Sequence, residues 1–201
     1  MEYQRSCIFG GTFDPIHNAH LRIALEAVKR FKLDRVLFVP AGNPPHKESS
    51  SVTPFEDRFR MVELACEPYP KFTVSRMEEG QNDSYTVETL RRFRKGMAEG
   101  ERLFFLIGSD AFDELDSWHE SQHVIELTEF IVVERPGRQY RVAKNAIVHR
   151  LDGLALPISS SGIRERLASG EPTPELPAEV RKYIEDRGLY GAHRANFTVS
   201  R

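Results

Sequence analysis

The chain has 201 residues, of which 40% are hydrophobic, so it is long enough for one domain with a substantial core and too short for two full domains. Its 28 Lys and Arg residues nearly balance its 30 Asp and Glu residues, which argues against a surface built to coat nucleic acid. Two cysteines, Cys7 and Cys66, are too few for a disulfide framework and favour a reducing, cytoplasmic compartment. No signal core and no apolar run of bilayer length is found, so we expect no membrane association.

The first informative stretch, residues 7–21, joins an apolar run, a Gly-Gly pair and two histidines. Residues 7–9 predict a buried strand, and Gly10 and Gly11 let the backbone turn sharply and approach a ligand. Apolar residues at helical spacing predict a helix over residues 19–31. His17 and His20 therefore fall at a helix start, where free N–H groups and the helix dipole favour an anion.

Strands and helices alternate along the rest of the chain. Further strands are predicted at residues 35–40, 72–74, 103–107, 130–133 and 154–156. Helices are predicted at residues 53–66, 84–97, 111–115, 117–127, 158–168 and 180–187, the first of these with Thr53 as N-cap, Pro54 as first helical residue and a capping-box Glu56. Gly170 and Gly188 are predicted helix stops. Residues 138–150 give an ambiguous pattern, for which one polar helix is the suggestion.

This alternation predicts an α/β fold, a Rossmann-like doubly wound parallel sheet in a single domain of residues 1–191, followed by a polar tail at 192–201. Such sheets bind ligands at the carboxyl ends of their strands. The segments that follow strands are thereby expected to share one rim: residues 10–20, 43–47, 85–86, 108–110, 135 and 158–164.

A second motif, ISSSGIR, covers residues 158–164. Serines at a helix start often do no more than cap the helix. Here Arg164 follows them by about one turn, so backbone N–H groups, hydroxyls and a guanidinium could converge on phosphate.

Together the two motifs carry a family resemblance. GGTFDPIHNAH at residues 10–20 resembles the T/H-x-G-H signature of the nucleotidyltransferase superfamily, with Ala19 where glycine is usual. ISSSGIR resembles the ISSTxIR motif of the same superfamily, with Ser161 where threonine is common. The resemblance covers roughly residues 6–190, and within the superfamily it is best for the bacterial nicotinate-mononucleotide adenylyltransferases. Chain length, the NPPHK loop and the RPG turn at residues 135–137 support this family.

The resemblance implies an enzyme of NAD biosynthesis that joins nicotinate mononucleotide to the AMP part of ATP, with Mg²⁺ accompanying ATP. Its implied catalytic residues are His17, His20 and Arg164. Its implied ATP-binding residues are Gly10, Gly11, Thr12, Phe13, Gly108, Asp110, Ile158, Ser160 and Ser161. Its implied substrate-binding residues are Asn43, His46, Lys47, Tyr85, Thr86, Trp118 and Arg135, with Trp118 stacking on the pyridine ring and His119 standing where tyrosine is often found. No third His, Cys or carboxylate lies near the histidines in sequence, so no metal site made by protein ligands is expected.

The expected chemistry needs charge neutralisation rather than a base, because the attacking phosphate of the mononucleotide is already largely dianionic. His17 and His20, as donors or imidazolium groups, and Arg164 would neutralise the ATP phosphates. Alternatives are the same fold acting on nicotinamide mononucleotide or phosphopantetheine, and a sensor that binds nucleotide without turnover. A class I tRNA synthetase is disfavoured by the short chain and by the lack of a basic extension. A homo-oligomer is left open.

Overall fold

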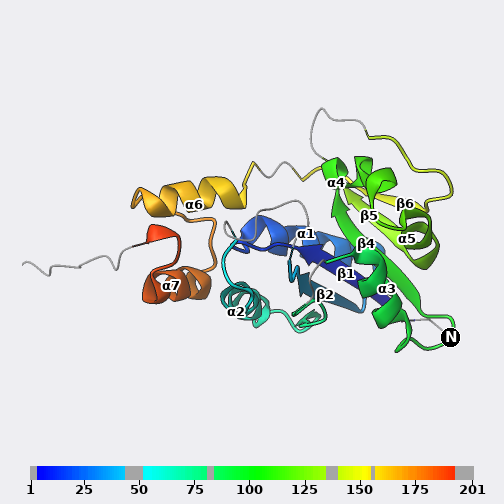
Figure 1. Ribbon diagram of the computed structural model, residues 1–201, viewed down its shortest axis with the longest axis horizontal. Coiled ribbons are helices and arrows are strands. Elements are labelled where there is room, and N and C mark those ends of the chain that lie inside the picture. Colours follow the sequence, from blue (N-terminus) through cyan, green and yellow to red (C-terminus); the bar gives the residue numbers. More distant parts are fainter. Residues whose placement is uncertain (1–3, 44–51, 81–83, 135–139, 155–156, 193–201) are drawn as a thin grey trace, which may run out of the picture.

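The computed structural model describes residues 4–43, 52–80, 84–134, 140–154 and 157–192. Its centre is a parallel sheet of six strands in the order β3-β2-β1-β4-β5-β6 (Figure 1). The strands are β1 (Arg5–Gly11), β2 (Arg35–Pro40), β3 (Phe72–Val74), β4 (Arg102–Gly108), β5 (Glu129–Val133) and β6 (Val148–Leu151). The helices are α1 (Asn18–Phe31), α2 (Phe55–Cys66), α3 (Thr86–Arg94), α4 (Ser109–Asp113), α5 (Ser121–Leu127), α6 (Ser160–Ala168) and α7 (Ala178–Arg187), with 3-10 turns η2 (Leu115–Ser117) and η3 (Leu189–Gly191). The predicted α/β fold is confirmed.

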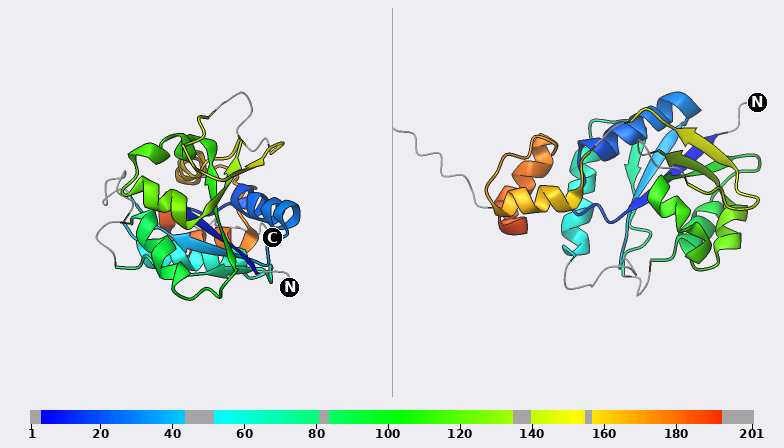
Figure 2. Two further views of the ribbon diagram at one scale, coloured as in Figure 1. Left: turned by 90° about the vertical axis from the view of Figure 1, so that its right-hand side faces the viewer. Right: turned by 90° about the horizontal axis from the view of Figure 1, so that it is seen from above.

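Side chains of alternate strand residues enter two separate cores, one on each face of the sheet. In β1, Cys7 and Phe9 belong to the core that α1, α2, α6 and α7 cover, whereas Ile8 belongs to the core under α3, α4 and α5. Figure 2 shows α1 and the pair α3 and α5 on opposite sides of the strands. Because both faces are buried, the strands read as continuous apolar runs rather than as alternating ones.

The strand order places β1 beside β4 in the middle of the sheet, with Phe9 in register with Leu106. From this pair the chain winds outward in both directions, through β2 and β3 on one side and β5 and β6 on the other. A crevice for ligands opens at such a switch point, outside the carboxyl ends of the two strands. Gly10 and Gly11 end β1 there, and Gly108 ends β4.

Helices α6 and α7 extend the molecule beyond α2, at the end opposite α5 (Figure 1). Helix α7 is hydrogen-bonded to Asp57 on α2. Oδ1 of Asp57 accepts from two α7 side chains, from Tyr183 Oη at 2.8 Å and from Arg187 Nε at 3.1 Å. The left-handed φ of 62° at Gly188 ends α7 as predicted.

Two helix predictions are corrected. Helix α2 begins at Phe55, with Pro54 at the cap. The Thr53 N–H, which a capping box would offer to Glu56, donates instead to Asp14 Oδ2 at 3.4 Å. The predicted capping box is therefore wrong. The helix predicted over residues 117–127 is shortened to α5, because Glu120 at its N-cap has a left-handed φ of 51°.

The sixth strand of the sheet is β6, earlier in the chain than the strand predicted at residues 154–156, of which 155 and 156 lie outside the described residues. The suggested polar helix over 138–150 is also wrong, since the last residues of that segment pair with β5. The polar side chains of this edge strand have partners on β5 and just after it: His149 Nε2 lies 2.6 Å from Glu129 Oε2, and Arg150 Nη1 lies 3.5 Å from Glu134. An edge strand with such pairs lacks the apolar run by which the other strands are recognised.

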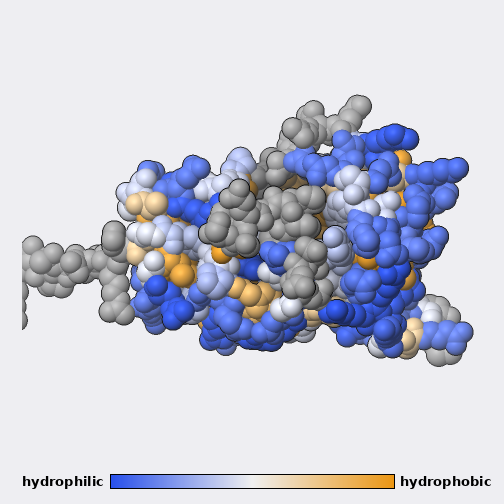
Figure 3. Space-filling view, viewed as in Figure 1, coloured by the Kyte–Doolittle hydropathy of each residue, from blue (hydrophilic) through white to orange (hydrophobic). Residues whose placement is uncertain are grey.

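Hydrophilic side chains cover most of the face seen in Figure 3, especially over α3 and α5. Within the described ranges, large hydrophobic side chains are exposed at three scattered positions, Leu25, Val142 and Ile147. Nor does any helix there have the length and apolar character that a membrane span requires. The described surface therefore shows no large apolar patch that would compete with the crevice at the carboxyl edge of the sheet as a ligand site.

Candidate active site

The two histidines meet at the start of α1. His17 is its N-cap and is only 4% exposed, and its backbone N–H donates to Nδ1 of His20 at 3.2 Å. The two rings stack with centroids 3.8 Å apart. Since Nδ1 of His20 accepts this hydrogen bond, the proton of the neutral ring sits on Nε2, which makes His20 a hydrogen-bond donor at its outer nitrogen.

Both histidines are neutral in the free protein at neutral pH. Burial lowers the pKa of His17 to about 4, against a smaller opposing effect of Glu175. Burial and the neighbouring His17 hold the pKa of His20 well below its ordinary value. Stacked rings that cannot both carry charge in an apolar setting favour neutral imidazole donors over the imidazolium groups that were the other expectation.

Helix α6 is attached to the loop that precedes His17. Ser159 caps the helix, its Oγ accepting from the Gly162 N–H at 3.2 Å. Ser160 Oγ donates to the Pro15 carbonyl at 3.0 Å, and Arg164 Nη1 donates to the Asp14 carbonyl at 2.8 Å. The second sequence motif is thus held directly against the first, although 140 or so residues separate them.

We call the cavity beside these two motifs the histidine cavity. It measures about 710 Å³. Its lining residues are Phe9, His17, Ala19, His20, Ile23, Gly108, Val133, Glu134, Leu154, Pro157, Ile158, Ser159 and Ser160. It combines apolar walls with histidine and serine donors, a composition suited to a nucleotide and its phosphates.

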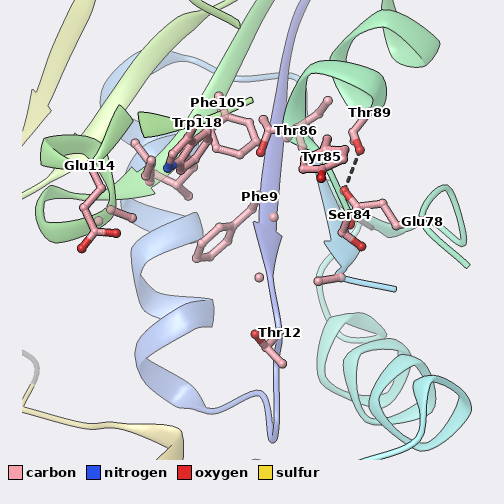
Figure 4. A pocket seen from close by; sticks show the side chains of 18 of the residues that line it. Phe9, Thr12, Glu78, Ser84, Tyr85, Thr86, Thr89, Phe105, Glu114 and Trp118 are labelled. Atoms are coloured by element: carbon pink, nitrogen blue, oxygen red, sulfur yellow. Dashed lines mark hydrogen bonds between the residues drawn. The ribbon is translucent and has the colours of Figure 1, made fainter. Parts of the chain in front are cut away.

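A second cavity, which we call the tryptophan cavity, measures about 570 Å³ and lies over β1 and β4 (Figure 4). Trp118 and Phe105 lie together on one side of it with an edge-to-face geometry, ring centroids 6.2 Å apart. Tyr85, Ser84 and Glu78 come from the other side. Its remaining lining residues are Ile8, Phe9, Gly10, Gly11, Thr12, Ala41, Thr86, Thr89, Leu106, Ile107, Gly108, Ala111, Glu114, Ser117 and His119.

Phe9 and Gly108 line both cavities. Phe9 ends the buried part of β1, and Gly108 is the last residue of β4, so the cavities adjoin at the switch point of the sheet. Two ligands bound one in each cavity would meet above these two residues.

The predicted site residues divide as follows. The histidine cavity contains His17, His20, Gly108, Ile158 and Ser160. The tryptophan cavity contains Gly10, Gly11, Thr12, Gly108, Tyr85, Thr86 and Trp118.

Other predicted residues line neither cavity. Phe13 is a core residue, 3% exposed, that packs edge-to-face on His20 at 5.2 Å and so supports the ring rather than the ligand. Asn43 is linked to the site through Ser84, to whose Oγ its N–H donates at 3.1 Å. Asp110, Ser161 and Arg164 are not among the lining residues of either cavity. His46, Lys47 and Arg135 lie outside the described residues.

Several lining residues were missed from the sequence. Glu78 follows β3 and so belongs to the same carboxyl edge, which was a usable signal. Glu134 carried the same signal, because it follows β5 directly. Phe105 carried none, because a continuous apolar strand does not reveal which side chain faces a ligand. His119, beside Trp118, packs its ring on Tyr85 at 4.4 Å.

Within the described part of the chain, no group of three or more His, Cys, Asp or Glu side chains is arranged to hold a metal ion. The donors around the histidine cavity are neutral imidazoles and hydroxyls. Such groups suit phosphate oxygens, and a hard cation that prefers oxygen ligands fits this site as a companion of ATP.

Comparison with known proteins identifies relatives over most of the chain. Residues 8–166 match the cytidylyltransferase-like family model. A probable nicotinate-nucleotide adenylyltransferase of Solibacter usitatus (strain Ellin6076) is 49% identical over 91% of this chain and 97% of the relative. One of Geobacillus thermodenitrificans (strain NG80-2) is 42% identical over 92% of this chain and 85% of the relative.

Among solved structures, the fold resembles nicotinic acid mononucleotide adenylyltransferase of Plasmodium falciparum, seen in complexes with APC and with NaAD. The TM-score is 0.77 at 21% identity, over 95% of this chain and 99% of that one. At this identity the likeness concerns the fold, whereas the relatives above share much more of the sequence. The chain belongs to the nicotinate-nucleotide adenylyltransferase family, within the cytidylyltransferase-like proteins.

Proposed function

We propose that this protein transfers the adenylyl group of ATP to nicotinate mononucleotide, giving nicotinate adenine dinucleotide and pyrophosphate in NAD biosynthesis. One observation carries the proposal most directly. A cavity whose hydrogen-bond donors suit phosphate adjoins a cavity with an aromatic wall, at the switch point of the sheet. ATP would occupy the histidine cavity and the mononucleotide the tryptophan cavity. Family membership makes this the expected activity.

In this scheme the phosphate of the mononucleotide attacks the α-phosphorus of ATP, and the bond to pyrophosphate breaks. Since that phosphate has a second pKa of about 6, it is a dianion at neutral pH and needs no base. The Nε2–H group of His20 donates to an oxygen of the α-phosphate as charge builds up on it, and the stacked His17 ring offers a second imidazole donor. Arg164, held against the Asp14 carbonyl by Nη1, offers the rest of its fork to the departing pyrophosphate.

A magnesium ion accompanying ATP would supply charge neutralisation on the triphosphate. The residues of this chain contribute the orientation of the two ligands and the donors at the α-phosphate.

The start of α3 is the proposed receptor for the pyridine carboxylate. Intrahelical bonding of α3 begins where the Glu88 N–H donates to the Tyr85 carbonyl at 3.0 Å, so the N–H groups of Thr86 and Val87 precede the ladder. Thr86 lines the tryptophan cavity. Donors at a helix start favour a carboxylate over an amide.

Turnover with ATP and a panel of phosphorylated acceptors, followed by mass analysis of the product, tests the proposal. Nicotinate mononucleotide should give nicotinate adenine dinucleotide and one pyrophosphate per product. A sensor without turnover would bind ATP and release no pyrophosphate, and an enzyme for phosphopantetheine would leave both pyridine mononucleotides unchanged. A homo-oligomer and a cytoplasmic location stay predictions, the second supported by two buried, free cysteines.

A further inference from the structure

Arg58 on α2 is among the most deeply buried side chains of the protein, only 1% exposed. Arginine is rarely buried this completely, because its charge loses hydration and all its N–H groups then need partners. Burial accordingly lowers the pKa of Arg58, and the nearby charges of Asp14 and Glu78 act in the opposite direction. The free-energy cost of burying this charge must be offset by the hydrogen bonds that the guanidinium makes.

The guanidinium binds the main chain of three segments that are distant in sequence. Nη1 donates to the Thr12 carbonyl at 2.8 Å, in the loop that leads to His17. Nη2 donates to the Gly42 carbonyl at 3.3 Å, just beyond β2. Nε donates to the Thr53 carbonyl at 2.8 Å, in front of α2. One planar fork thus fixes three backbone positions at once.

The two loops need such a brace because they leave the sheet here. Where they leave the strands, a backbone hydrogen bond joins the Ala41 N–H to the Gly11 carbonyl at 2.9 Å. The next residue in each loop is Thr12 after Gly11 and Gly42 after Ala41. Arg58 binds the carbonyls of both. The side chain therefore continues the β1–β2 connection past the end of the strands.

Gly42 in turn is locked to the wall of the tryptophan cavity. A Cβ at this position would lie 1.9 Å from the carbonyl oxygen of Glu78, so only glycine fits. The carboxylate of Glu78 lines that cavity and accepts from Thr89 Oγ1 at 2.6 Å, the bond drawn dashed in Figure 4. Asn43, the next residue, exchanges hydrogen bonds with Ser84 at 3.1 and 3.2 Å.

From these contacts we infer that Arg58 is a positioning residue that sets the distance between the histidine side and the mononucleotide side of the active site. The inference rests on the proposed function, because it assumes one substrate in each cavity. Arg58 itself lines neither cavity. Each substrate keeps its own contacts without Arg58, whereas the in-line approach of the two depends on it.

The decisive variant is Arg58→Lys, because an ammonium keeps the charge and cannot reach three carbonyls with one fork. We expect kcat to fall by about tenfold to a hundredfold, the size of effect that a displacement of about 1 Å produces. The Kd of Mg-ATP and the Kd of nicotinate mononucleotide, each measured alone by calorimetry, should stay within about threefold. Arg60→Lys is the matched control, since Arg60 is on the same helix, is about half exposed and pairs with Glu63. It should leave all three values unchanged.

A kcat of Arg58→Lys within twofold of wild type would overturn the inference. A fall in kcat together with a similar rise in both Kd values would also overturn it, because Arg58 would then support the stability of the whole fold. Should Arg58→Lys fail to fold because an unpaired ammonium is left buried, Arg58→Gln removes the charge and also cannot reach all three carbonyls. It should show the same split between kcat and binding, and wild-type kcat in that variant would equally refute the inference. If wild type rejects nicotinate mononucleotide, the proposed function fails by itself, and the same comparison is made with the acceptor it does use.

Discussion

The backbone N–H of His17 donates to Nδ1 of His20 at 3.2 Å, and the two rings stack with centroids 3.8 Å apart. This relationship assigns the tautomer of His20. Burial, together with the cost of placing a second charge beside the first, lowers the pKa of His20 and keeps the pair neutral. The outer nitrogen of His20 is therefore a ready donor before any substrate arrives.

His20→Ala should lower kcat by on the order of a hundredfold or more, with little change in nucleotide binding, as for a donor that acts mainly on the transition state. His17→Ala should act similarly and should also weaken ATP binding. Steady-state kinetics and the Kd of ATP separate these effects. His123→Ala is the control, since His123 is more than half exposed and pairs with Glu120. Near-normal turnover in both active-site variants would contradict the mechanism.

The neutral histidines also predict how stability depends on pH. The pKa of His17 is about 4 in the folded protein, against an ordinary value of 6.5. The unfolded chain therefore takes up a proton first as the pH falls, so stability is full above about 6.5 and is lost between 6.5 and 4. The loss from His17 is about 3 kcal/mol, and His20 adds to it in the same direction.

Urea unfolding at pH 7, 6, 5 and 4.5 measures this loss. A variant with both His17→Asn and His20→Asn should lose less stability than wild type across that window. Parallel curves for the two proteins would show that the histidines do not titrate on unfolding as described.

Arg164→Lys should reduce kcat/KM for ATP by roughly tenfold or more although the charge is kept. Nη1 of Arg164 holds the Asp14 carbonyl, and a lysine ammonium cannot both make that contact and meet a phosphate as a planar fork does. Arg166→Lys, on the same helix and paired with Glu175 at 2.8 Å, is the comparison. Equal kinetics for the two variants would remove Arg164 from the site.

The parallel fold was predictable because both faces of the central strands are covered, which produces the apolar runs of β1, β2 and β4. The failures fall at the edge of the sheet. In β6, His149 and Arg150 replace apolar residues because partners on and beside β5, rather than burial, hold them. Thr53 looks like a helix cap, and only tertiary contacts with Asp14 and Arg58 show that it is not one.

Sequence motifs mark some of the residues that the structure brings to the histidine cavity, such as His17 and Ser160. Arg58 could not be found in this way, since an arginine inside a helical segment is ordinarily a surface residue. Its role depends on three backbone carbonyls that only the folded chain brings together. Phe13 lies inside the motif, and only the folded chain shows that its ring is buried against His20.

Trp118→Ala should raise KM for the pyridine mononucleotide by about tenfold, the order expected for losing an aromatic face of this size. The KM for ATP serves as the internal control and should stay within twofold, because Trp118 lines the tryptophan cavity and not the histidine cavity. A rise in the KM for ATP alone would show that the two substrates occupy the opposite cavities to those proposed.

The most direct test of the central claim is the ratio of kcat/KM for nicotinate mononucleotide to that for nicotinamide mononucleotide, with product identity confirmed by mass. The N–H groups at the start of α3 offer donors to the ring substituent, and a charge-assisted hydrogen bond is worth roughly 1.5 to 3 kcal/mol. We predict that the acid is preferred by about tenfold to a few hundredfold, and that Trp118→Ala leaves this preference in place. Equal efficiency with the amide, or a preference for it, would contradict the assignment of the α3 start as the carboxylate receptor.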